Sequence, residues 1–526
     1  MNPSQNTPKN KNPHSQNTLL LMLLLLLPTL SNSFPKPPPL PILPLPTFNQ
    51  LQWQQTEMAL FLHFGPNTFN DSEWGTGRAD PAIFNPESMD ALQWARTASE
   101  AGFSRVVLTA KHHDGFCLWP SDLTDYSVRS SPWRGGAGDV VGELAEAARE
   151  VGIGLGLYLS PWDRHEPSYG KTREYNEFYV GQMTELLTRY GEIKEVWLDG
   201  AKGKGEKDMD YFFDCWFDLI HQLQPRAIIF SDGGPDARWV GDEAAVSRST
   251  CWSLFNKSSA LIGHTDDYYS GRGDPRGLDW VPPECDVSIR PGWFWHKSER
   301  PKNATTLLDI YYKSVGRNCQ LLLNVPPNSS GLISEEDIQV LQEFANLRSI
   351  IFSTNLAENA TVTASSKRGG INETRFDPSH VLRDGIYTYW APEERQCYWT
   401  VYVDLGQPVT FNVLRVQEPI QMGQRIMEFH LDIQRGGGEW TMIANGTTIG
   451  YKRLLRFPKV ECQFLRFVVG KARADPLIAY IGLYLDLFST VKNETSRGSH
   501  SHFNRSQAIR FKMGNQSLKG VTRAAM

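Results

Sequence analysis

A regular alternation of short apolar runs and longer amphipathic segments between residues 50 and 352 is the feature that most constrains the fold. The apolar runs predict strands at 59–65, 104–115, 152–163, 195–200, 226–234 and 320–328. The amphipathic segments predict helices at 85–103, 139–152, 173–191, 210–225, 305–318 and 334–351. Strands that alternate with helices in this way favour a parallel α/β fold.

Two further strands, or irregular substitutes for them, are expected within residues 235–300. They would complete a (β/α)8-like TIM barrel, which is the leading prediction for the fold class. The alternative is a doubly wound open sheet, but no G-x-G-x-x-G sequence follows the first predicted strand. The predicted barrel therefore occupies residues 50–352.

The pattern changes after residue 352. Between residues 353 and 490, short alternating runs are separated by turn residues at the spacing typical of an all-β sandwich. The last segment, 491–526, is basic and lacks apolar periodicity, and we predict a disordered tail there.

The N-terminus has the composition of a secretory signal peptide, predicted at residues 1–33. A Leu-rich run at 19–27 follows basic residues and precedes small ones that suit cleavage. The run is too short to cross a bilayer as a helix, which requires about 20 apolar residues. A proline-rich spacer is predicted at 34–49.

Sequons for N-glycosylation agree with a secreted, extracellular protein, which in a plant would lie in the apoplast. A net charge of −5 gives no reason to expect nucleic acid or an anionic membrane as a partner. Any single sequon can arise by chance, but their density is typical of a chain that enters the secretory pathway. Glycosylation is predicted at Asn256, Asn303, Asn328, Asn359, Asn372 and Asn445.

Seven cysteines are spread along the chain without a C-x-x-C pair, so a zinc ribbon or a redox motif is not expected. Their odd number implies at least one free thiol. Cys397 and Cys462 are the only cysteines after residue 352, which leaves a bridge between them open.

The stretch IKEVWLDGA, residues 193–201, reads as a strand that stops at a carboxylate. Val196 and Leu198 are apolar, and Asp199 and Gly200 then end the run. Barrel enzymes display catalytic carboxylates at the carboxyl ends of strands in this way, although D-G is also a common turn pair. We therefore predict that Asp199 is the reactive group.

Other strand ends supply side chains that a barrel would bring to the same mouth. His63 follows the first predicted strand, His112 and His113 follow the second, and Tyr158 lies near the end of the third. Each histidine taken singly could be structural, but three at adjacent strand ends favour a site.

Hydrolysis of a glycosidic bond needs two carboxyl groups, and carboxylates beside imidazoles and indoles suit that reaction. With Asp199 as the nucleophile, the sequence leaves three candidates for the acid that protonates the leaving oxygen. These candidates are Glu73, Glu243 and Glu284.

The strongest rival function is metal-dependent hydrolysis, because His and Asp at strand ends are metal-ligand types. Against it, the first strand ends in a lone His63 and no H-E-x-x-H is present. The adjacent His112 and His113 would point to opposite faces if the strand stayed regular. A Ser triad is weaker still because G-x-S-x-G is missing, and a glycan-binding protein that has lost catalysis is disfavoured by the intact carboxylates.

Longer motifs stand in order along residues 50–351: HFGPNTFNDSEWG (63–75), LTAKHHDGFCLWPS (108–121), VWLDGA (196–201), RWVGDE (238–243) and PECDVSIRPGWFWH (283–296). Together they resemble the alpha-L-fucosidases of glycoside hydrolase family 29, in particular the branch that acts on α-1,3/1,4-linked fucose. The second domain resembles a discoidin-like β-sandwich through NATVTASS (359–366), DGIYTYWAP (384–392) and TVYVDLG (400–406).

The resemblance implies a retaining, exo-acting enzyme that removes terminal α-L-fucose from oligosaccharides or glycoproteins, with no cofactor and no metal. Asp199 matches the family nucleophile and Glu243 its acid/base, with Glu284 in reserve. Bacterial relatives usually carry Asn before that acid, so Asp242 would raise the pKa of Glu243 by like-charge repulsion. The positions that hold the sugar's hydroxyls and flank its methyl group match His63, Glu73, Trp74, His112, His113, Tyr158 and Trp197.

Overall fold

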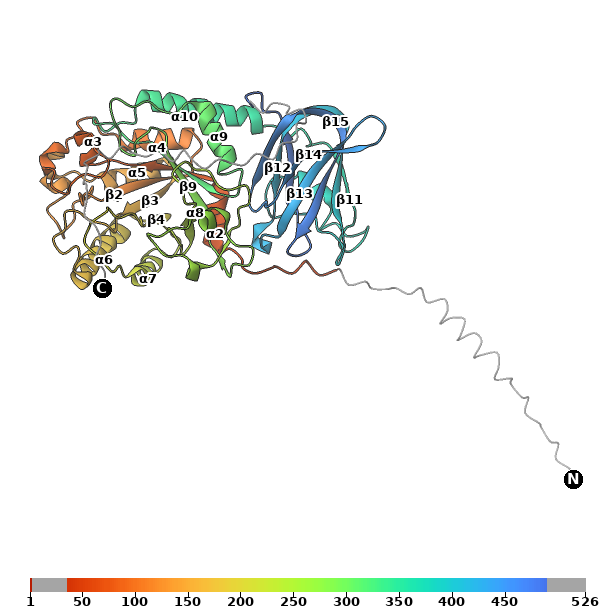
Figure 1. Cartoon of the computed structure of the whole chain (residues 1–526), viewed down its shortest axis with the longest axis horizontal. Helices are drawn as coiled ribbons and strands as arrows, with labels where there is room; N and C mark the ends of the chain where they lie inside the picture. Colours follow the sequence, from red (N-terminus) through yellow and green to blue (C-terminus); the bar gives the residue numbers. More distant parts are fainter. Residues whose placement is uncertain (2–35, 490–526) are drawn as a thin grey trace, which may run out of the picture. The chain divides into compact units, whose positions relative to one another are not determined.

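The computed structural model describes Met1 and residues 36–489. The predicted tail at 491–526 and, apart from Met1, the predicted signal peptide at 1–33 lie outside the described residues. Figure 1 follows the chain from the first described helix, α2, through the barrel strands to the C-terminal strands β11–β16. Within residues 36–489, no helix combines the length and the apolar character that crossing a bilayer requires.

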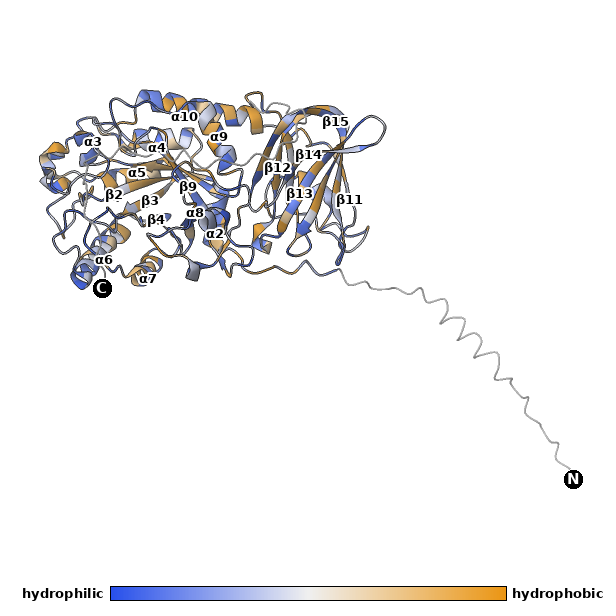
Figure 2. Ribbon diagram, viewed as in Figure 1, coloured by the Kyte–Doolittle hydropathy of each residue, from blue (hydrophilic) through white to orange (hydrophobic). Residues whose placement is uncertain are grey.

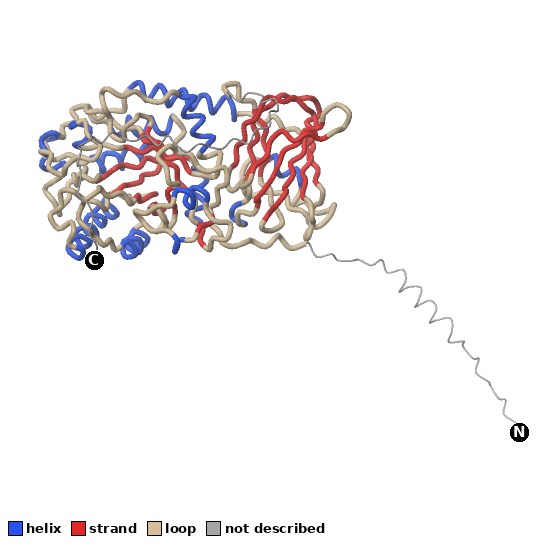
Figure 3. The backbone as a smooth tube through the Cα atoms, in the orientation of Figure 1, coloured by secondary structure: helices blue, strands red, loops and turns tan. Residues whose placement is uncertain are grey.

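Eight parallel strands close into a barrel in the order β1-β10-β9-β6-β5-β4-β3-β2 (Figure 3). The six strands predicted from apolar runs all form, and β6 and β9 supply the two expected within 235–300, which confirms the TIM-like barrel. The strands are β1 (Met58–Leu62), β2 (Arg105–Lys111), β3 (Gly154–Leu159), β4 (Glu195–Trp197), β5 (Ile228–Ser231), β6 (Ala237–Trp239), β9 (Pro283–Ser288) and β10 (Gln320–Asn324).

Helices cover the barrel at most of the predicted positions. The helix α5 shows why the local sequence folds this way: the Asp139 side chain accepts a hydrogen bond from Gly142 N at 2.8 Å, and Gly152 ends the helix with a φ of 81°. The helices are α2 (Phe48–Thr56), α3 (Pro66–Asn70), α4 (Ala91–Glu100), α5 (Val140–Val151), α6 (Thr172–Arg189), α7 (Phe213–Leu223), α8 (Asp267–Arg272), α9 (Ala304–Lys313) and α10 (Glu335–Phe352).

The barrel is irregular between β5 and β9. Residues 232–236 alone connect β5 to β6, with no helix between them. The longer connection from β6 to β9 holds the six-residue α8, a short 3-10 helix (Lys257–Ser259) and a small antiparallel pair, β7 (Leu254–Phe255) with β8 (Asp279–Trp280). Loops therefore build this side of the barrel mouth.

The C-terminal region forms an antiparallel sheet in the order β11-β12-β15-β13-β14, with β16 paired to β12. Alternate residues of β12 face the core, since Val401 and Val403 are buried while Tyr402 is exposed. Apolar residues concentrate along the strands (Figure 2). The strands are β11 (Thr361–Ala364), β12 (Trp399–Gln417), β13 (Ile426–Gln434), β14 (Trp440–Gly446), β15 (Arg453–Ala472) and β16 (Tyr480–Tyr484).

The proline-rich segment before the barrel is extended and is held by arginines of the C-terminal region. Arg368 donates to the carbonyl of Pro37 at 2.7 Å, and Arg425 donates to that of Leu40 at 2.7 Å. A segment without its own apolar core thus gains its order from side-chain hydrogen bonds to its backbone.

The one disulfide among residues 36–489 joins Cys285 of β9 to Cys319, which directly precedes β10. Cys397 and Cys462 are both free, so the disulfide that the sequence left open between them does not form. Cys397 is exposed in the loop before β12, whereas Cys462 is buried in β15, and the two do not meet. Neighbouring barrel strands instead bring together two cysteines that are 34 residues apart.

Candidate active site

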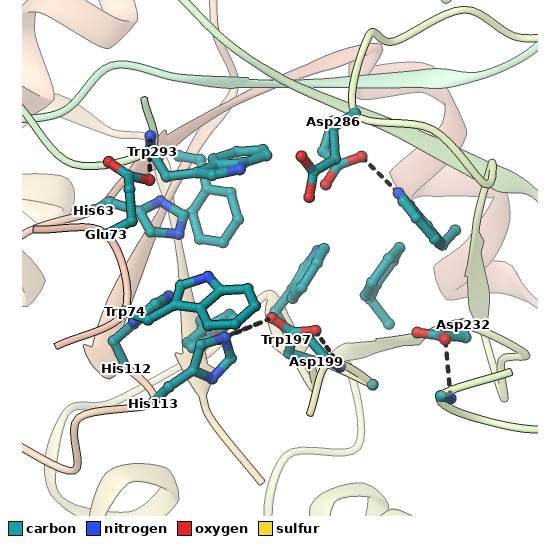
Figure 4. A pocket seen from close by; sticks show the side chains of 18 of the residues that line it. His63, Glu73, Trp74, His112, His113, Trp197, Asp199, Asp232, Asp286 and Trp293 are labelled. Carbon is teal, nitrogen blue, oxygen red and sulfur yellow. Dashed lines mark hydrogen bonds and ion pairs between the residues drawn. The ribbon is translucent and has the colours of Figure 1, made fainter. Parts of the chain in front are cut away.

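A cavity of about 290 Å³ opens at the carboxyl ends of the barrel strands. Figure 4 shows the histidines and Trp74 on one side of it, Asp286 and Asp232 on other sides, and Asp199 between them. The lining combines aromatic rings with a few convergent polar groups, as small-ligand sites do. It consists of Phe61, His63, Glu73, Trp74, His112, His113, Tyr158, Trp197, Asp199, Gly200, Ala201, Phe230, Asp232, Trp239, Glu243, Gly263, Thr265, Asp286 and Trp293.

Asp199 stands where the sequence predicts it, just past the carboxyl end of β4. Its Oδ2 accepts a hydrogen bond from the Tyr158 hydroxyl at 2.9 Å, and its Oδ1 accepts one from Ala201 N at 2.7 Å. Burial raises the pKa of Asp199 above its usual value, while these two hydrogen bonds lower it. The carboxylate is therefore fixed in orientation and faces the cavity.

Three histidines line the cavity in their neutral form. Burial lowers the pKa of His63 and of His113 to about 3, and it holds the pKa of His112 well below its usual value. Although His113 Nε2 lies 3.7 Å from Asp199 Oδ2, the uncharged imidazole does not form an ion pair with it. These rings are hydrogen-bonding groups rather than cations.

Hydrogen bonds fix the tautomers of two of these rings. The amide of Asn324 presents its oxygen to His63 Nδ1 at 2.9 Å, so that Nδ1 donates. Ser160 donates its own proton to the Trp162 carbonyl, so it accepts from His113 Nδ1 at 2.7 Å. Both rings then carry an unprotonated Nε2, which is a hydrogen-bond acceptor.

His112 and His113 do not point to opposite faces, contrary to the expectation for a regular strand. The pairing of β2 with β3 shifts register between Thr109 and Lys111, and β2 ends at Lys111. Past that irregularity both imidazoles line the cavity, with their ring centroids 4.1 Å apart. The Nδ1 atom of His112 is buried and has no hydrogen-bond partner among the described residues.

Glu73 and Trp74 reach the cavity from the loop after α3. The carboxylate of Glu73 accepts hydrogen bonds from Trp293 N at 2.9 Å and Phe294 N at 3.3 Å, and it lies 2.6 Å from His296 Nε2. Trp74 is 51% exposed at the rim. Glu73 is thus anchored to the loop after β9.

Glu243 lines the cavity from the loop after β6, and its outer side is exposed. Loss of hydration is the largest cause that raises the pKa of Glu243, and a hydrogen bond from Trp293 lowers it. The negative charges of Asp199, Glu73 and Asp242 raise the pKa further. The predicted influence of Asp242 is therefore present, but smaller than that of burial.

Glu284, the reserve acid, does not reach the cavity. It is buried inside the barrel, where its Oε1 accepts from Arg105 Nη2 at 3.2 Å and its Oε2 accepts from Trp197 Nε1 at 3.0 Å. Glu284 is the second residue of β9, whereas Asp286 lies two residues nearer the mouth on the same face of the strand. Glu284 supports the Trp197 ring that lines the cavity.

Sequence reasoning missed two further carboxylates of the cavity. Asp286 accepts a hydrogen bond from Trp239 Nε1 at 2.7 Å, and burial, followed by the charge of Glu243, raises its pKa well above the usual value. Asp232 accepts from Gly263 N at 3.0 Å and from the Thr265 hydroxyl at 2.8 Å.

Two signals could have found these residues. Asp232 stands before a glycine at the end of a strand, as Asp199 does. Asp286 follows Glu284 at the two-residue spacing of a strand face. Their roles depend on loops whose paths are set by distant residues.

Among the described residues, no group of three or more His, Cys, Asp or Glu side chains is arranged to hold a metal ion. The ring nitrogens that would be ligands are partly engaged elsewhere, as His63 Nδ1 is with Asn324. The site residues are arranged to hydrogen-bond a polar, neutral ligand between aromatic faces.

A closed parallel barrel whose mouth holds anchored carboxylates, neutral imidazoles and indoles around one small cavity defines a glycoside hydrolase of the barrel type. The family model described as alpha-L-fucosidase matches residues 51–349. Alpha-L-fucosidase 1 of Arabidopsis thaliana is 66% identical over 89% of this chain and 92% of the relative.

Solved structures agree with the sequence relatives. The crystal structure of SpGH29 superposes with a TM-score of 0.82 at 41% identity, over 85% of this chain and 100% of that one. A GH29 fucosidase of Ruminococcus gnavus in complex with fucose superposes with a TM-score of 0.80 at 35% identity, over 88% and 99% of the two chains. The chain belongs to the alpha-L-fucosidase family and is a glycoside hydrolase.

Proposed function

We propose that the protein is a secreted, exo-acting, retaining alpha-L-fucosidase that removes terminal α-1,3/1,4-linked fucose from glycans or glycoproteins. The cavity of about 290 Å³ supports exo action, because it is at the small end of ligand sites and suits one monosaccharide. The proposed linkage rests on the motifs shared with the α-1,3/1,4-acting branch.

The observation that carries the proposal is the fixed carboxylate of Asp199. In the first step its free lone pair attacks the anomeric carbon, while Glu243 gives its proton to the glycosidic oxygen and the bond to the leaving sugar breaks. In the second step Glu243 takes a proton from water, whose oxygen displaces Asp199 and releases fucose with retained configuration. The raised pKa of Glu243 favours the protonated form that the first step needs.

The remaining cavity residues bind the sugar. The neutral rings of His63 and His113 offer acceptors to its hydroxyls. The ring of His112 lines the cavity beside them. The stacked pair of Trp197 and Phe230, with ring centroids 4.0 Å apart, supplies an apolar wall for the face that carries the methyl group.

Replacement of the nucleophile tests the mechanism. Asp199→Ala should lower kcat on an activated aryl fucoside by about 10³-fold or more, and added azide should restore turnover as the β-fucosyl azide. Asp232→Ala is the matched control: it removes another strand-end carboxylate that precedes a glycine, and azide should not rescue it. Proton NMR of the wild-type reaction should show α-L-fucose as the first anomer; the β-anomer would refute retention.

Secretion is tested by expression in a eukaryotic host with residues 1–33 present or deleted. The full chain should appear in the medium and shift in mass on enzymatic removal of N-glycans. We expect Asn359, Asn372 and Asn445, which are exposed, to be modified. Asn328 should be a poor acceptor, because it is half-buried and its amide nitrogen donates to Ser334 at 3.3 Å.

A further inference from the structure

A second hollow, of about 570 Å³, lies directly behind the loop that carries Glu243. Trp239 and Glu243 line the catalytic cavity, whereas the intervening Val240, Gly241 and Asp242 line this hollow. The two spaces are therefore separated by one stretch of backbone. A side chain on Gly241 would come within 2.8 Å of the Asp267 Cα, so the loop packs closely against the start of α8.

Three arginines line this hollow, which we call the arginine groove: Arg248, Arg272 and Arg317. Within the described part of the chain, none of these guanidinium groups has a carboxylate oxygen within 4.0 Å, the largest distance counted as an ion pair. Asp242 also lines the groove, but its Oδ1 is occupied by the backbone N–H groups of Ala244 and Val246. In a chain with a net charge of −5, three unpaired guanidinium groups around one hollow are a local excess of positive charge.

An aromatic ring, rather than an acid, positions two of these cations. The guanidinium of Arg248 lies 4.8 Å from the centroid of the Tyr268 ring. Arg272 Nη1 donates to the Tyr268 hydroxyl at 3.2 Å, and its guanidinium lies 5.8 Å from the same ring. Cation–π contacts hold the charges in place while most of their N–H donors stay free.

Arg248 packs against the backbone of Gly271 at the edge of the groove. A Cβ at Gly271 would stand 3.4 Å from both Cγ and Nε of Arg248, which is van der Waals contact, and only 3.0 Å from the Val240 carbonyl oxygen. Like charges held close together without a counter-ion repel each other. An anion that bridges them would remove this repulsion, and planar guanidinium groups match a carboxylate with paired hydrogen bonds.

The groove also carries acidic residues, since Asp242 and Asp267 line it beside the arginines. This mixture disfavours a polyanion such as nucleic acid, whose charges would meet those carboxylates. It suits a molecule with one carboxylate and many hydroxyls. A saccharide that contains a uronic acid residue carries these groups.

We propose that the arginine groove is an aglycone subsite that binds a uronate residue of the glycan from which fucose is removed. This inference rests on the proposed function: Glu243 must contact the glycosidic oxygen, so the leaving saccharide passes over Glu243 and continues beyond the 240–242 wall. Arg248 and Arg272 bind the carboxylate, and Asp242 and Asp267 accept hydrogen bonds from hydroxyls.

The test compares two fucosylated oligosaccharides that differ only in whether one aglycone residue is a uronate or the corresponding neutral sugar, together with an aryl fucoside. Wild-type enzyme should show a kcat/KM about 10-fold or more higher for the acidic substrate, and the advantage should shrink as salt rises. The double variant Arg248→Gln/Arg272→Gln should lose this advantage through KM and keep its rates on the neutral substrate and the aryl fucoside. Equal rates of the wild type on both oligosaccharides would overturn the proposal.

Two control variants test whether the preference depends on the positive charge of the groove. A further comparison distinguishes a failure of the uronate subsite from a failure of the fucosidase function. Arg248→Lys, which retains the charge, should keep part of the preference, and Arg276→Gln, an exposed arginine outside the groove, should keep all of it. A double variant that lost acidic and neutral substrates alike would refute the subsite. Failure of the wild type to hydrolyse the aryl fucoside would instead refute the function, while isothermal titration with trigalacturonate would still report on the groove.

Discussion

The hydroxyl of Tyr158, on β3, donates a hydrogen bond of 2.9 Å to Oδ2 of Asp199, which follows β4. Burial, and then the charge of Asp199, raises the pKa of Tyr158 well above its usual value, so the phenol stays protonated and acts as a donor. Neighbouring strands of a parallel barrel thus fix the orientation of the Asp199 carboxylate, the proposed nucleophile, without a positive charge. A fixed, partly desolvated carboxylate is well placed for attack on an anomeric carbon.

Removal of this hydroxyl should affect both rate and pH dependence. Tyr158→Phe loses a charge-assisted hydrogen bond, so kcat/KM should fall about 10- to 100-fold. Because that bond lowers the pKa of Asp199, the acidic limb of the pH profile should move to higher pH. Tyr175→Phe is the matched control, since it removes a buried hydroxyl that donates to the Pro161 carbonyl at 2.7 Å. An unmoved acidic limb in Tyr158→Phe would contradict this account.

The identity of the acid can be decided by leaving-group dependence. Glu243→Gln should slow hydrolysis of a natural oligosaccharide about 10²- to 10⁴-fold and that of an activated aryl fucoside much less, because only the former needs a proton.

Glu284→Gln should instead destabilise the fold by about 1–3 kcal/mol. Arg105 and Trp197 both donate to Glu284, and an amide can accept from only one of them. Thermal unfolding and the two substrates separate these outcomes; a leaving-group effect in Glu284→Gln alone would reverse the assignment.

The pH profile of kcat/KM should be bell-shaped, with each limb displaced to higher pH than the ordinary pKa of its carboxyl group would give. Asp199 must be ionised, so activity falls as pH drops through its raised pKa. Glu243 must be protonated, so activity falls as pH rises through its raised pKa. Asp242→Asn removes a negative neighbour and should move the alkaline limb to lower pH, by about half a pH unit or less.

Glu192→Gln is the control for that shift, because Glu192 precedes β4 and so lies at the opposite end of the barrel from the cavity. An alkaline limb that moved equally in both variants, or moved up in Asp242→Asn, would disprove the role of Asp242.

A histidine joins two carboxylates at the edge of the site and should make the site sensitive to pH. Burial lowers the pKa of His296, but hydrogen bonds to Glu73 and Asp71 outweigh it and raise that pKa above 6.5. Protonated His296 therefore stabilises the fold below pH 6.5, and this contribution is lost as pH rises through the raised pKa. It amounts to at most about 1 kcal/mol, because Glu73 and Asp71 are partly exposed.

The measurement is thermal stability and KM between pH 5 and 9 for the wild type and His296→Asn. The variant should be less stable at pH 5 and nearly equal to the wild type at pH 9. The KM of the wild type should rise over this range as the loop that carries Glu73 loosens. Identical pH dependence in both proteins would rule out this role for His296.

The alternation of apolar runs with amphipathic segments predicted most of the barrel. Parallel strands that are buried on both faces form nearly continuous apolar runs, which distinguishes them from loops. The two strands that this alternation left unplaced are those with little apolar character: β6 is Ala-Arg-Trp, and β9 carries Glu284, Asp286 and Ser288. The polar side chains of β9 find their partners on other strands, as Glu284 does with Arg105 and Trp197. Arg238 of β6 instead donates to backbone carbonyls in the connection between β6 and β9. A pattern read from one segment contains no information about such partners.

Chemistry at strand ends predicted Asp199 and the histidines, and the cavity contains all of them. It left Glu73, Glu243 and Glu284 as candidate acids, from which the family resemblance selected Glu243, and of these three the cavity contains Glu73 and Glu243. The adjacent His112 and His113 share a cavity only because β2 loses its regular register. The place of Asp232 in the site depends on a distant loop, whose Gly263 and Thr265 donate hydrogen bonds to its carboxylate. Such features depend on contacts between residues that are far apart in the sequence.

By itself, the sequence determined which segments are strands and helices and which strands end in reactive side chains, because both are set by local composition and spacing. Only the tertiary structure decided that Glu284 lies beneath Trp197 while Asp286 faces the cavity, and that Cys285 meets Cys319. It also decided that Arg248 and Arg272 share one aromatic ring behind the Glu243 loop. Barrel closure and loop packing fix these relationships, since they set distances between residues that chain order leaves free.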